Sequence, residues 1–86
     1  MSIAYDDVVN AQKAQGNVIR KTSLTFSDTF TEITGSTIYL KNEFEQKTGS
    51  FKLRGAYYKI KTLSTEERKK GVVAASAGNH AQGVAY

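Results

Sequence analysis

The chain of 86 residues contains no cysteine, no proline and a single histidine, His80. Without cysteine there is neither a disulfide framework nor a thiolate metal site, and one histidine alone makes any metal site improbable. No apolar stretch is long enough to cross a membrane. The N-terminus has no basic region followed by an apolar core, so no signal peptide is predicted. These absences predict a cytoplasmic protein with no bound metal and no membrane partner.

Charge and composition further limit the class of protein to which the chain can belong. The hydrophobic fraction of 40% is typical of a globular protein and too high for a disordered one. The length allows one small domain or part of one. The net charge is +4, but Glu66 and Glu67 lie among the basic residues, and no nucleic-acid-binding motif is present. We therefore predict a solvated basic face and no nucleic-acid partner. A positive field would also suit an anionic cofactor and an amino-acid carboxylate.

Turn signals and apolar periodicity divide the chain into alternating helices and strands. Helices are expected over residues 6–14, 27–34 and 50–61, with shorter ones opening at Ser64 and near Asn79, and strands over 37–41 and 72–75, with a polar loop over 42–49. Strand, helix and strand in that order form a βαβ unit, which is right-handed and belongs in a parallel sheet covered on both faces. The sequence therefore predicts an α/β fold.

Several residues predict details of these elements. Ser27 and Gly35 are expected to cap the two ends of the second helix. Ser64 with Glu67 three residues later fits a capping box. Phe51, Tyr57 and Ile60 could face a core from the helix over 50–61.

The most informative motif is SFKLRGA, at residues 50–56. Ser50 is a suitable N-cap, which places Lys52 in the first turn of a helix. The helix N-terminus carries a partial positive charge, so its field disfavours the ammonium form of Lys52, and burial would lower the pKa in the same direction. A neutral amine is what Schiff-base chemistry with an aldehyde cofactor requires. The alternative is a surface lysine that merely begins a helix.

A second motif, ASAGNHAQG at residues 75–83, follows the apolar run 72–75. A strand, a turn of small residues and a helix N-terminus together present backbone N–H groups to an anion. A substrate carboxylate would suit this geometry, and Asn79 adds an amide with donors and an acceptor. The alternative is an ordinary strand-to-helix turn with Asn79 as its cap.

With these two motifs at this spacing, the chain resembles the pyridoxal-phosphate (PLP)-dependent threonine dehydratases, or threonine ammonia-lyases, of the tryptophan-synthase-β-like group. The resemblance begins around residues 21–24, strengthens over 38–43, and is strong over 46–56 and 70–84. It implies PLP fold type II, a three-layer fold with a parallel sheet. Residues 1–86 would be the N-terminal, βαβ-containing part of the catalytic domain. Serine dehydratases and serine racemases would fit the same two motifs.

The resemblance also implies roles for individual residues. Lys52 would form the Schiff base with PLP and would then act as the base at the substrate α-carbon. Phe51 would pack beside the cofactor ring, and Asn79 would hydrogen-bond the 3-hydroxyl of that ring. The substrate carboxylate would be held by the Ser76 hydroxyl and by backbone N–H groups of Ser76, Ala77, Gly78, Asn79 and His80.

Several features differ from those of a complete member of this group. Ser23 stands where the group usually has proline, which puts the rigidity of that turn in doubt and leaves the chemistry untouched. The seven glycines are scattered singly, so no glycine-rich phosphate cup is present, and the last helical pattern continues up to Tyr86. Two strands are also too few for a stable buried sheet. We therefore expect an N-terminal fragment that binds PLP poorly by itself.

Three functions remain open at this stage. The first is α,β-elimination of L-threonine or L-serine to a 2-oxo acid and ammonia, in isoleucine biosynthesis or threonine catabolism, by a parent homodimer or homotetramer. The second is a related PLP enzyme such as serine racemase. The third is a stand-alone binding module without catalysis. Threonine synthase is disfavoured, because its lysine motif usually carries an acidic residue where this chain has Leu53.

Overall fold

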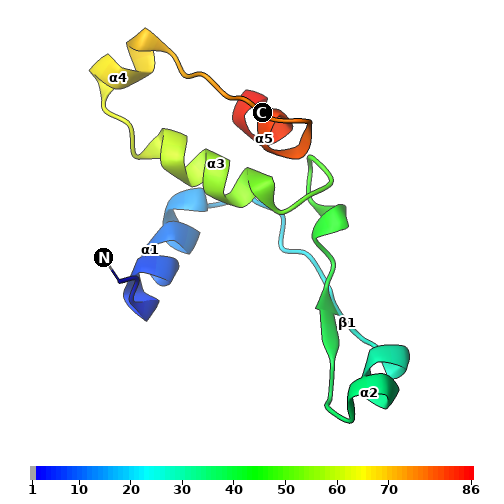
Figure 1. Ribbon diagram of the computed structural model, residues 1–86. Helices are drawn as coiled ribbons and strands as arrows, with labels where there is room; N and C mark the ends of the chain where they lie inside the picture. The colour runs from blue at the N-terminus through cyan, green and yellow to red at the C-terminus, as the bar shows by residue number, and fades with distance from the viewer. Residues whose placement is uncertain (1) are drawn as a thin grey trace.

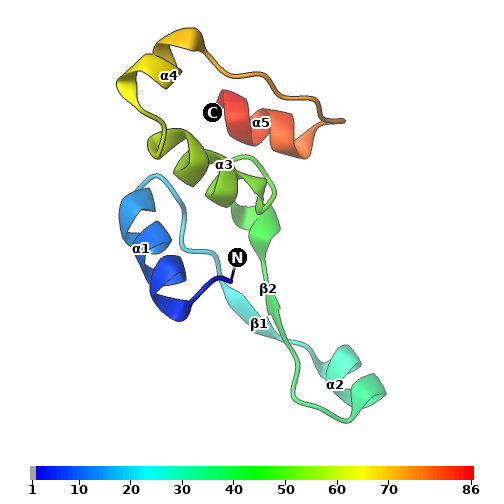
Figure 2. The same ribbon diagram turned by 60° about the vertical axis from the view of Figure 1, so that its left-hand side comes forward.

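The computed structural model describes residues 2–86, which form a helical body with a projecting arm (Figures 1 and 2). The elements in chain order are α1 (Tyr5–Gln15), β1 (Leu24–Phe26), α2 (Asp28–Thr34), β2 (Tyr39–Lys41), a 3₁₀ helix (Glu43–Glu45), α3 (Lys52–Lys61), α4 (Thr65–Lys70) and α5 (Asn79–Ala85). The radius of gyration is 16.0 Å, whereas a compact domain of this length would have about 12 Å. The chain is therefore elongated. No helix within residues 2–86 has the length and apolar character needed to cross a membrane.

Local capping signals produce the short helices as predicted. The Ser27 hydroxyl accepts a hydrogen bond of 3.1 Å from the Phe30 N–H at the start of α2, and Gly35 ends this helix in the left-handed region at φ 71°. In α4, the Ser64 hydroxyl accepts from the Glu67 N–H at 3.2 Å, and the Glu67 carboxylate accepts from the Ser64 N–H at 2.8 Å. Both predicted caps are confirmed, because each depends only on residues within one helical turn.

The arm is a two-stranded antiparallel ribbon whose connection contains α2 (Figure 2). Leu24 lies opposite Lys41 and Phe26 lies opposite Tyr39. The rings of Phe26 and Tyr39 meet edge-on with centroids 5.6 Å apart, a favoured aromatic geometry. The predicted strand over 37–41 is present as β2, whereas β1 was not predicted from the sequence.

The prediction of a second strand over residues 72–75 is not met within residues 2–86. This segment is extended but pairs with no strand, and Val73 is 99% exposed. The two strands that do form pair with each other in the arm, so no parallel neighbour is available to the segment before α5. The βαβ unit with a parallel sheet is therefore absent from residues 2–86, since a parallel strand needs a partner for its backbone groups.

The small core lies where α3 packs against α5. Leu53 is fully buried and Ala56 is 5% exposed on α3. Gly83 of α5 is also buried. α1 packs on α3 as well. The predicted core residue Phe51 is instead 58% exposed, and Tyr57 and Ile60 are only half-buried. The reason is that α5 packs on the face of α3 that carries Leu53 and Ala56.

Gly83 allows α3 and α5 to approach closely. A Cβ atom at this position would lie 3.2 Å from the Leu53 backbone nitrogen and 3.3 Å from the Ala56 Cβ. Backbone atoms cannot move aside as a flexible side chain would. Gly55 of α3 is a matched comparison, because a Cβ there would meet no atom within 4 Å.

We expect Gly83→Ala to lower the free energy of unfolding by about 1–3 kcal/mol, since overpacking forces the two helices apart. Gly55→Ala should raise the same free energy by about 0.5–1 kcal/mol, because it only reduces the freedom of the unfolded chain. Urea unfolding followed by circular dichroism measures both. Equal stabilisation by the two substitutions would show that the close approach at Gly83 imposes no constraint.

Candidate active site

Lys52 lies in the first turn of α3, as the sequence predicted, and is the first residue of that helix. The N-cap is Phe51, with φ −72° and ψ −13°, and not Ser50. The Ser50 hydroxyl still accepts from the Lys52 backbone N–H, at the long distance of 3.4 Å. The Lys52 side chain is exposed, so the burial considered from the sequence is not found, and its Nζ lies 5.2 Å from the centroid of the Phe51 ring. The amine is therefore accessible from solvent.

The second motif forms a turn that leads into α5. Asn79 begins this helix as predicted, but Gly78 and not Asn79 is its N-cap. The Ser76 hydroxyl accepts a hydrogen bond of 3.1 Å from the Gly78 N–H. One of the backbone donors expected to face a carboxylate is therefore already bound within the turn. The side chains of Asn79 and His80 are exposed.

The packing of α3 on α5 connects the two motifs. Leu53, directly after Lys52, contacts Gly83 at the crossing of the two helices. Among residues 2–86, however, no hydrogen bond or ion pair joins the Lys52 side chain to residues 76–80. The structure places both motifs on one helix pair without direct contact between their functional groups.

A polar cluster that the sequence did not predict lies beside the lysine motif. The Arg54 guanidinium binds the Glu43 carboxylate through two hydrogen bonds, from Nε to Oε2 at 2.7 Å and from Nη2 to Oε1 at 2.8 Å. The Thr22 hydroxyl donates to the same carboxylate at 2.5 Å. We call Thr22, Glu43 and Arg54 the clasp. The only sequence signal was a pair of opposite charges on either side of Lys52, with Glu43 in the predicted polar loop and Arg54 in the predicted helix that follows it.

The buried Gln46 side chain strengthens this region. Its Oε1 accepts from the Arg20 backbone N–H at 2.8 Å, and its Nε2 donates to the Arg20 carbonyl at 2.9 Å. Gln46 is 3% exposed and Thr22 is 4% exposed. Buried polar groups are costly unless they are hydrogen-bonded, so these paired contacts fix the chain that precedes Lys52.

The clasp perturbs the ionisation of its charged members. The hydrogen bond from Arg54 lowers the pKa of Glu43 from 4.5 to about 2, assisted by the Thr22 hydroxyl and opposed by partial burial. The same contact raises the pKa of Arg54. Glu45 has a lowered pKa for a different reason, because it accepts from the backbone N–H and the hydroxyl of Ser23. Both glutamates therefore stay ionised near neutral pH.

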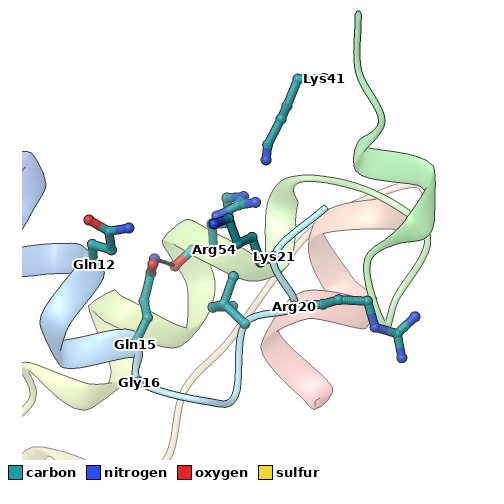
Figure 3. A pocket seen from close by; sticks show the side chains of 8 residues that line it. Gln12, Gln15, Gly16, Arg20, Lys21, Lys41 and Arg54 are labelled. Atoms are coloured by element: carbon teal, nitrogen blue, oxygen red, sulfur yellow. Dashed lines mark hydrogen bonds between the residues drawn. The ribbon is translucent and has the colours of Figure 1, made fainter. Parts of the chain in front are cut away.

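A hollow of about 270 Å³ lies between the end of α1 and the clasp (Figure 3). It is lined by Gln12, Gln15, Gly16, Ile19, Arg20, Lys21, Lys41 and Arg54. In Figure 3, Lys41 reaches toward Arg54, whereas Arg20 points away from the hollow. The Lys41 ammonium already donates to the Thr22 carbonyl at 2.7 Å. This hollow is lined by neither Lys52 nor residues 76–80, so it lies outside the candidate active site.

Comparison with known proteins identifies the family. The sequence pattern of the family described as "Pyridoxal-phosphate dependent enzyme" matches residues 16–86. The chain belongs to this family, and its cofactor is pyridoxal phosphate.

Two individual proteins are similar to nearly the whole chain. The chain is 61% identical to the L-threonine ammonia-lyase of Thermotoga maritima over 96% of its own length and 21% of that protein. It is 48% identical to the catabolic L-threonine dehydratase of Escherichia coli K12, over 98% of this chain and 26% of the relative. The chain thus spans about a fifth to a quarter of the length of these relatives.

Two solved structures are also similar. The structure of maize serine racemase matches with a TM-score of 0.85 and 35% identity, over 99% of this chain and 27% of the other. The processed form of threonine deaminase isoform 2 from Solanum lycopersicum matches with a TM-score of 0.71 and 38% identity, over 99% and 25%. These matches and the family assignment confirm the predicted class, PLP fold type II, although its parallel sheet does not form within residues 2–86.

The clasp predicts a specific pH dependence. We expect the Glu43 side chain to titrate near pH 2, and Arg54→Gln to move its pKa back toward 4.5. Because the folded-state pKa lies below the unfolded value, the stabilising contribution is complete above about pH 4.5 and is lost as the pH falls toward 2. Carboxyl carbon chemical shifts measured against pH test this directly.

The control for this titration is Glu66→Gln, a change in α4 that should leave the Glu43 titration curve unaltered. The difference in unfolding free energy between the wild type and Glu43→Gln should also shrink between pH 5 and pH 2. A Glu43 titration near 4.5 in the wild type would contradict the ion pair.

Proposed function

We propose that residues 1–86 are the N-terminal part of the catalytic domain of a PLP-dependent enzyme that eliminates water from L-threonine or L-serine. The products are a 2-oxo acid and ammonia, so the whole protein would be a threonine ammonia-lyase, also called threonine dehydratase. The observation that carries this proposal is the 61% identity to a protein of that name across nearly the whole chain. The lysine motif at the start of α3 supplies the residue that such chemistry needs.

The exposed groups of the chain are chemically suited to the cofactor. The Lys52 amine is accessible, and the ion pair found among residues 2–86 belongs to Glu43 and Arg54, so Lys52 is not held by a carboxylate. The Asn79 amide is also exposed at the start of α5. Bound PLP supplies an electron sink that stabilises a carbanion at the substrate α-carbon.

Each residue of the two motifs has a proposed task. Lys52 attaches the cofactor through its Nζ atom, and the same atom then takes the α-proton of the substrate. Asn79 binds the 3-hydroxyl of the cofactor ring through its side-chain amide. Phe51 packs beside the ring and excludes water from it, for which its exposed side chain is available.

The turn over residues 76–80 would bind the substrate carboxylate. The Ser76 hydroxyl accepts from the Gly78 N–H, and a hydroxyl that accepts one hydrogen bond still has its own proton to donate. Ser76 can therefore donate to a carboxylate while it holds the turn closed. The backbone N–H groups of Ser76, Ala77, Asn79 and His80 are the remaining donors of this turn, while that of Gly78 is bound.

A racemase is the second candidate, favoured by the similarity to the structure of maize serine racemase. The two activities differ in their products, since elimination from L-serine yields a 2-oxo acid and ammonia whereas racemisation yields D-serine. Chromatography of the products of L-serine and L-threonine decides between them. A non-catalytic binding module would give neither product and no adduct at Lys52.

The wider setting follows from the proposed activity. The small-molecule partner would be an amino acid, and the protein would act in the cytoplasm as a homodimer or homotetramer. Its step would belong to isoleucine biosynthesis or to threonine catabolism, as the names of the catabolic relative of Escherichia coli and of a biosynthetic L-threonine dehydratase of Lactococcus lactis, 51% identical to this chain, suggest.

Lys52→Ala in the complete protein should lower kcat for elimination by at least about 10³-fold, because it removes both the attachment point and the base. Lys59→Ala, an exposed lysine on the same helix, should retain activity. Oxo-acid production measures the rate, and mass spectrometry after borohydride reduction locates the PLP adduct. Elimination at a near wild-type rate in Lys52→Ala would refute the assignment.

Asn79→Ala should weaken PLP binding by roughly tenfold, as expected for one lost hydrogen bond of about 1.4 kcal/mol. The absorption spectrum of the bound cofactor should shift as well. Asn10→Ala, on the exposed face of α1, should change neither quantity. Titration with PLP followed by absorbance measures both, and an unchanged affinity with an unchanged spectrum would remove Asn79 from the site.

A further inference from the structure

Leu53 packs the first turn of α3 against α5, but no side chain caps the start of this turn firmly. Its N-cap residue, Phe51, makes no side-chain cap, and the hydrogen bond from the Lys52 N–H to the Ser50 hydroxyl is long at 3.4 Å. Helix N-termini leave backbone donors without partners and fray when no side chain caps them. The residue on which the proposed chemistry depends therefore stands at a weakly capped helix end.

The clasp acts on this same turn. Arg54 lies two residues after Lys52, and its guanidinium grips Glu43 through two parallel hydrogen bonds of 2.7 and 2.8 Å. Two-point pairing fixes orientation as well as distance, which a single contact between point charges does not. The Glu43 side chain is 18% exposed and the Arg54 side chain 33%, so solvent screens the pair only in part.

Two further contacts attach the turn and its preceding loop to the body. The Gln15 side-chain amide donates to the Arg54 carbonyl at 2.8 Å, which joins α3 to the end of α1 (Figure 3). The buried Gln46 amide binds both backbone groups of Arg20. The segment from Glu43 to Arg54, which carries Lys52, is thus held near both of its ends.

We propose that Glu43 and Arg54 are positioning residues for Lys52. By closing the segment from residue 43 to residue 54, their ion pair holds the first turn of α3 in one place, so that the Lys52 amine meets the cofactor in a single orientation. This role rests on the proposed function of Lys52. It predicts that the geometry of the pair, and not merely its contribution to stability, governs how fast Lys52 reacts.

The test uses the complete protein and three changes to the pair. Arg54→Lys keeps the charge but loses the two-pronged geometry, and Glu43→Gln removes the negative charge. The exchanged double variant, Glu43→Arg with Arg54→Glu, restores an ion pair with the positive charge at position 43 and the negative charge at position 54. The matched control is Glu45→Gln, in the same 3₁₀ helix, because Glu45 binds Ser23 and makes no contact with Arg54.

Three measurements are made on each variant. The first is the rate of PLP adduct formation at Lys52, with the adduct trapped by borohydride. The second is steady-state kinetics, which gives kcat and KM, and the third is amide hydrogen exchange over residues 49–53. We expect Arg54→Lys and Glu43→Gln to slow adduct formation and lower kcat by about 10- to 100-fold, as misplacement of a reacting group does. KM should change little, and exchange over residues 49–53 should accelerate. The exchanged variant should recover part of the loss, and Glu45→Gln should match the wild type.

The outcomes separate the two proposals. An adduct that forms at the wild-type rate in both Arg54→Lys and Glu43→Gln overturns the positioning role while leaving the proposed function intact. An equal loss in Glu45→Gln also overturns it, because the effect would then be general destabilisation. Absence of any Lys52 adduct in the wild type would instead defeat the proposed function. If Glu43→Gln does not fold, Arg54→Lys and the exchanged variant still decide the question.

Discussion

The ion pair between Glu43 and Arg54 connects parts of the chain that would otherwise be independent. Glu43 follows the ribbon of β1 and β2, Arg54 lies in the first turn of α3, and Thr22 binds the same carboxylate from the segment before β1. Three stretches of backbone thus meet at one carboxylate. Bidentate charge-assisted hydrogen bonds are among the strongest that side chains make, and partial burial reduces their screening by water. This contact links the lysine motif to the ribbon and to the segment before it, whereas the packing of α3 links it to α1 and α5.

Apolar packing is confined to a small core. The buried apolar side chains within residues 2–86 are Leu53 and Ala56, which face Gly83 across the α3–α5 contact. A core of this size supplies little hydrophobic free energy, which grows with the apolar area removed from water. Polar contacts therefore carry much of the long-range order, as the buried amide of Gln46 illustrates. The close approach at Gly83 matters because it is the point at which the two motif-bearing helices touch.

The predictions from sequence succeeded or failed according to the range of the interactions behind them. Ser27 and Gly35 cap the two ends of α2 as predicted, because capping involves residues within one turn. The strand predicted over residues 72–75 did not pair, because a strand requires a partner that its own residues do not specify. Phe51 was expected in the core from its helical spacing and is exposed, since the face that α3 buries depends on where α5 lies. The family was identifiable from two motifs, and the comparisons agree with it.

The sequence by itself determined the local features of this protein: the place of Lys52 in the first turn of α3, the start of α5 at Asn79, the capped short helices, and the pair of motifs that place the chain among the PLP enzymes. Only the tertiary structure decided that Glu43 binds Arg54 and that Gln46 binds the Arg20 backbone. The partners in these contacts lie 11 and 26 residues apart in the chain. At such separations the geometry of the whole fold, and not local propensity, selects which polar groups meet.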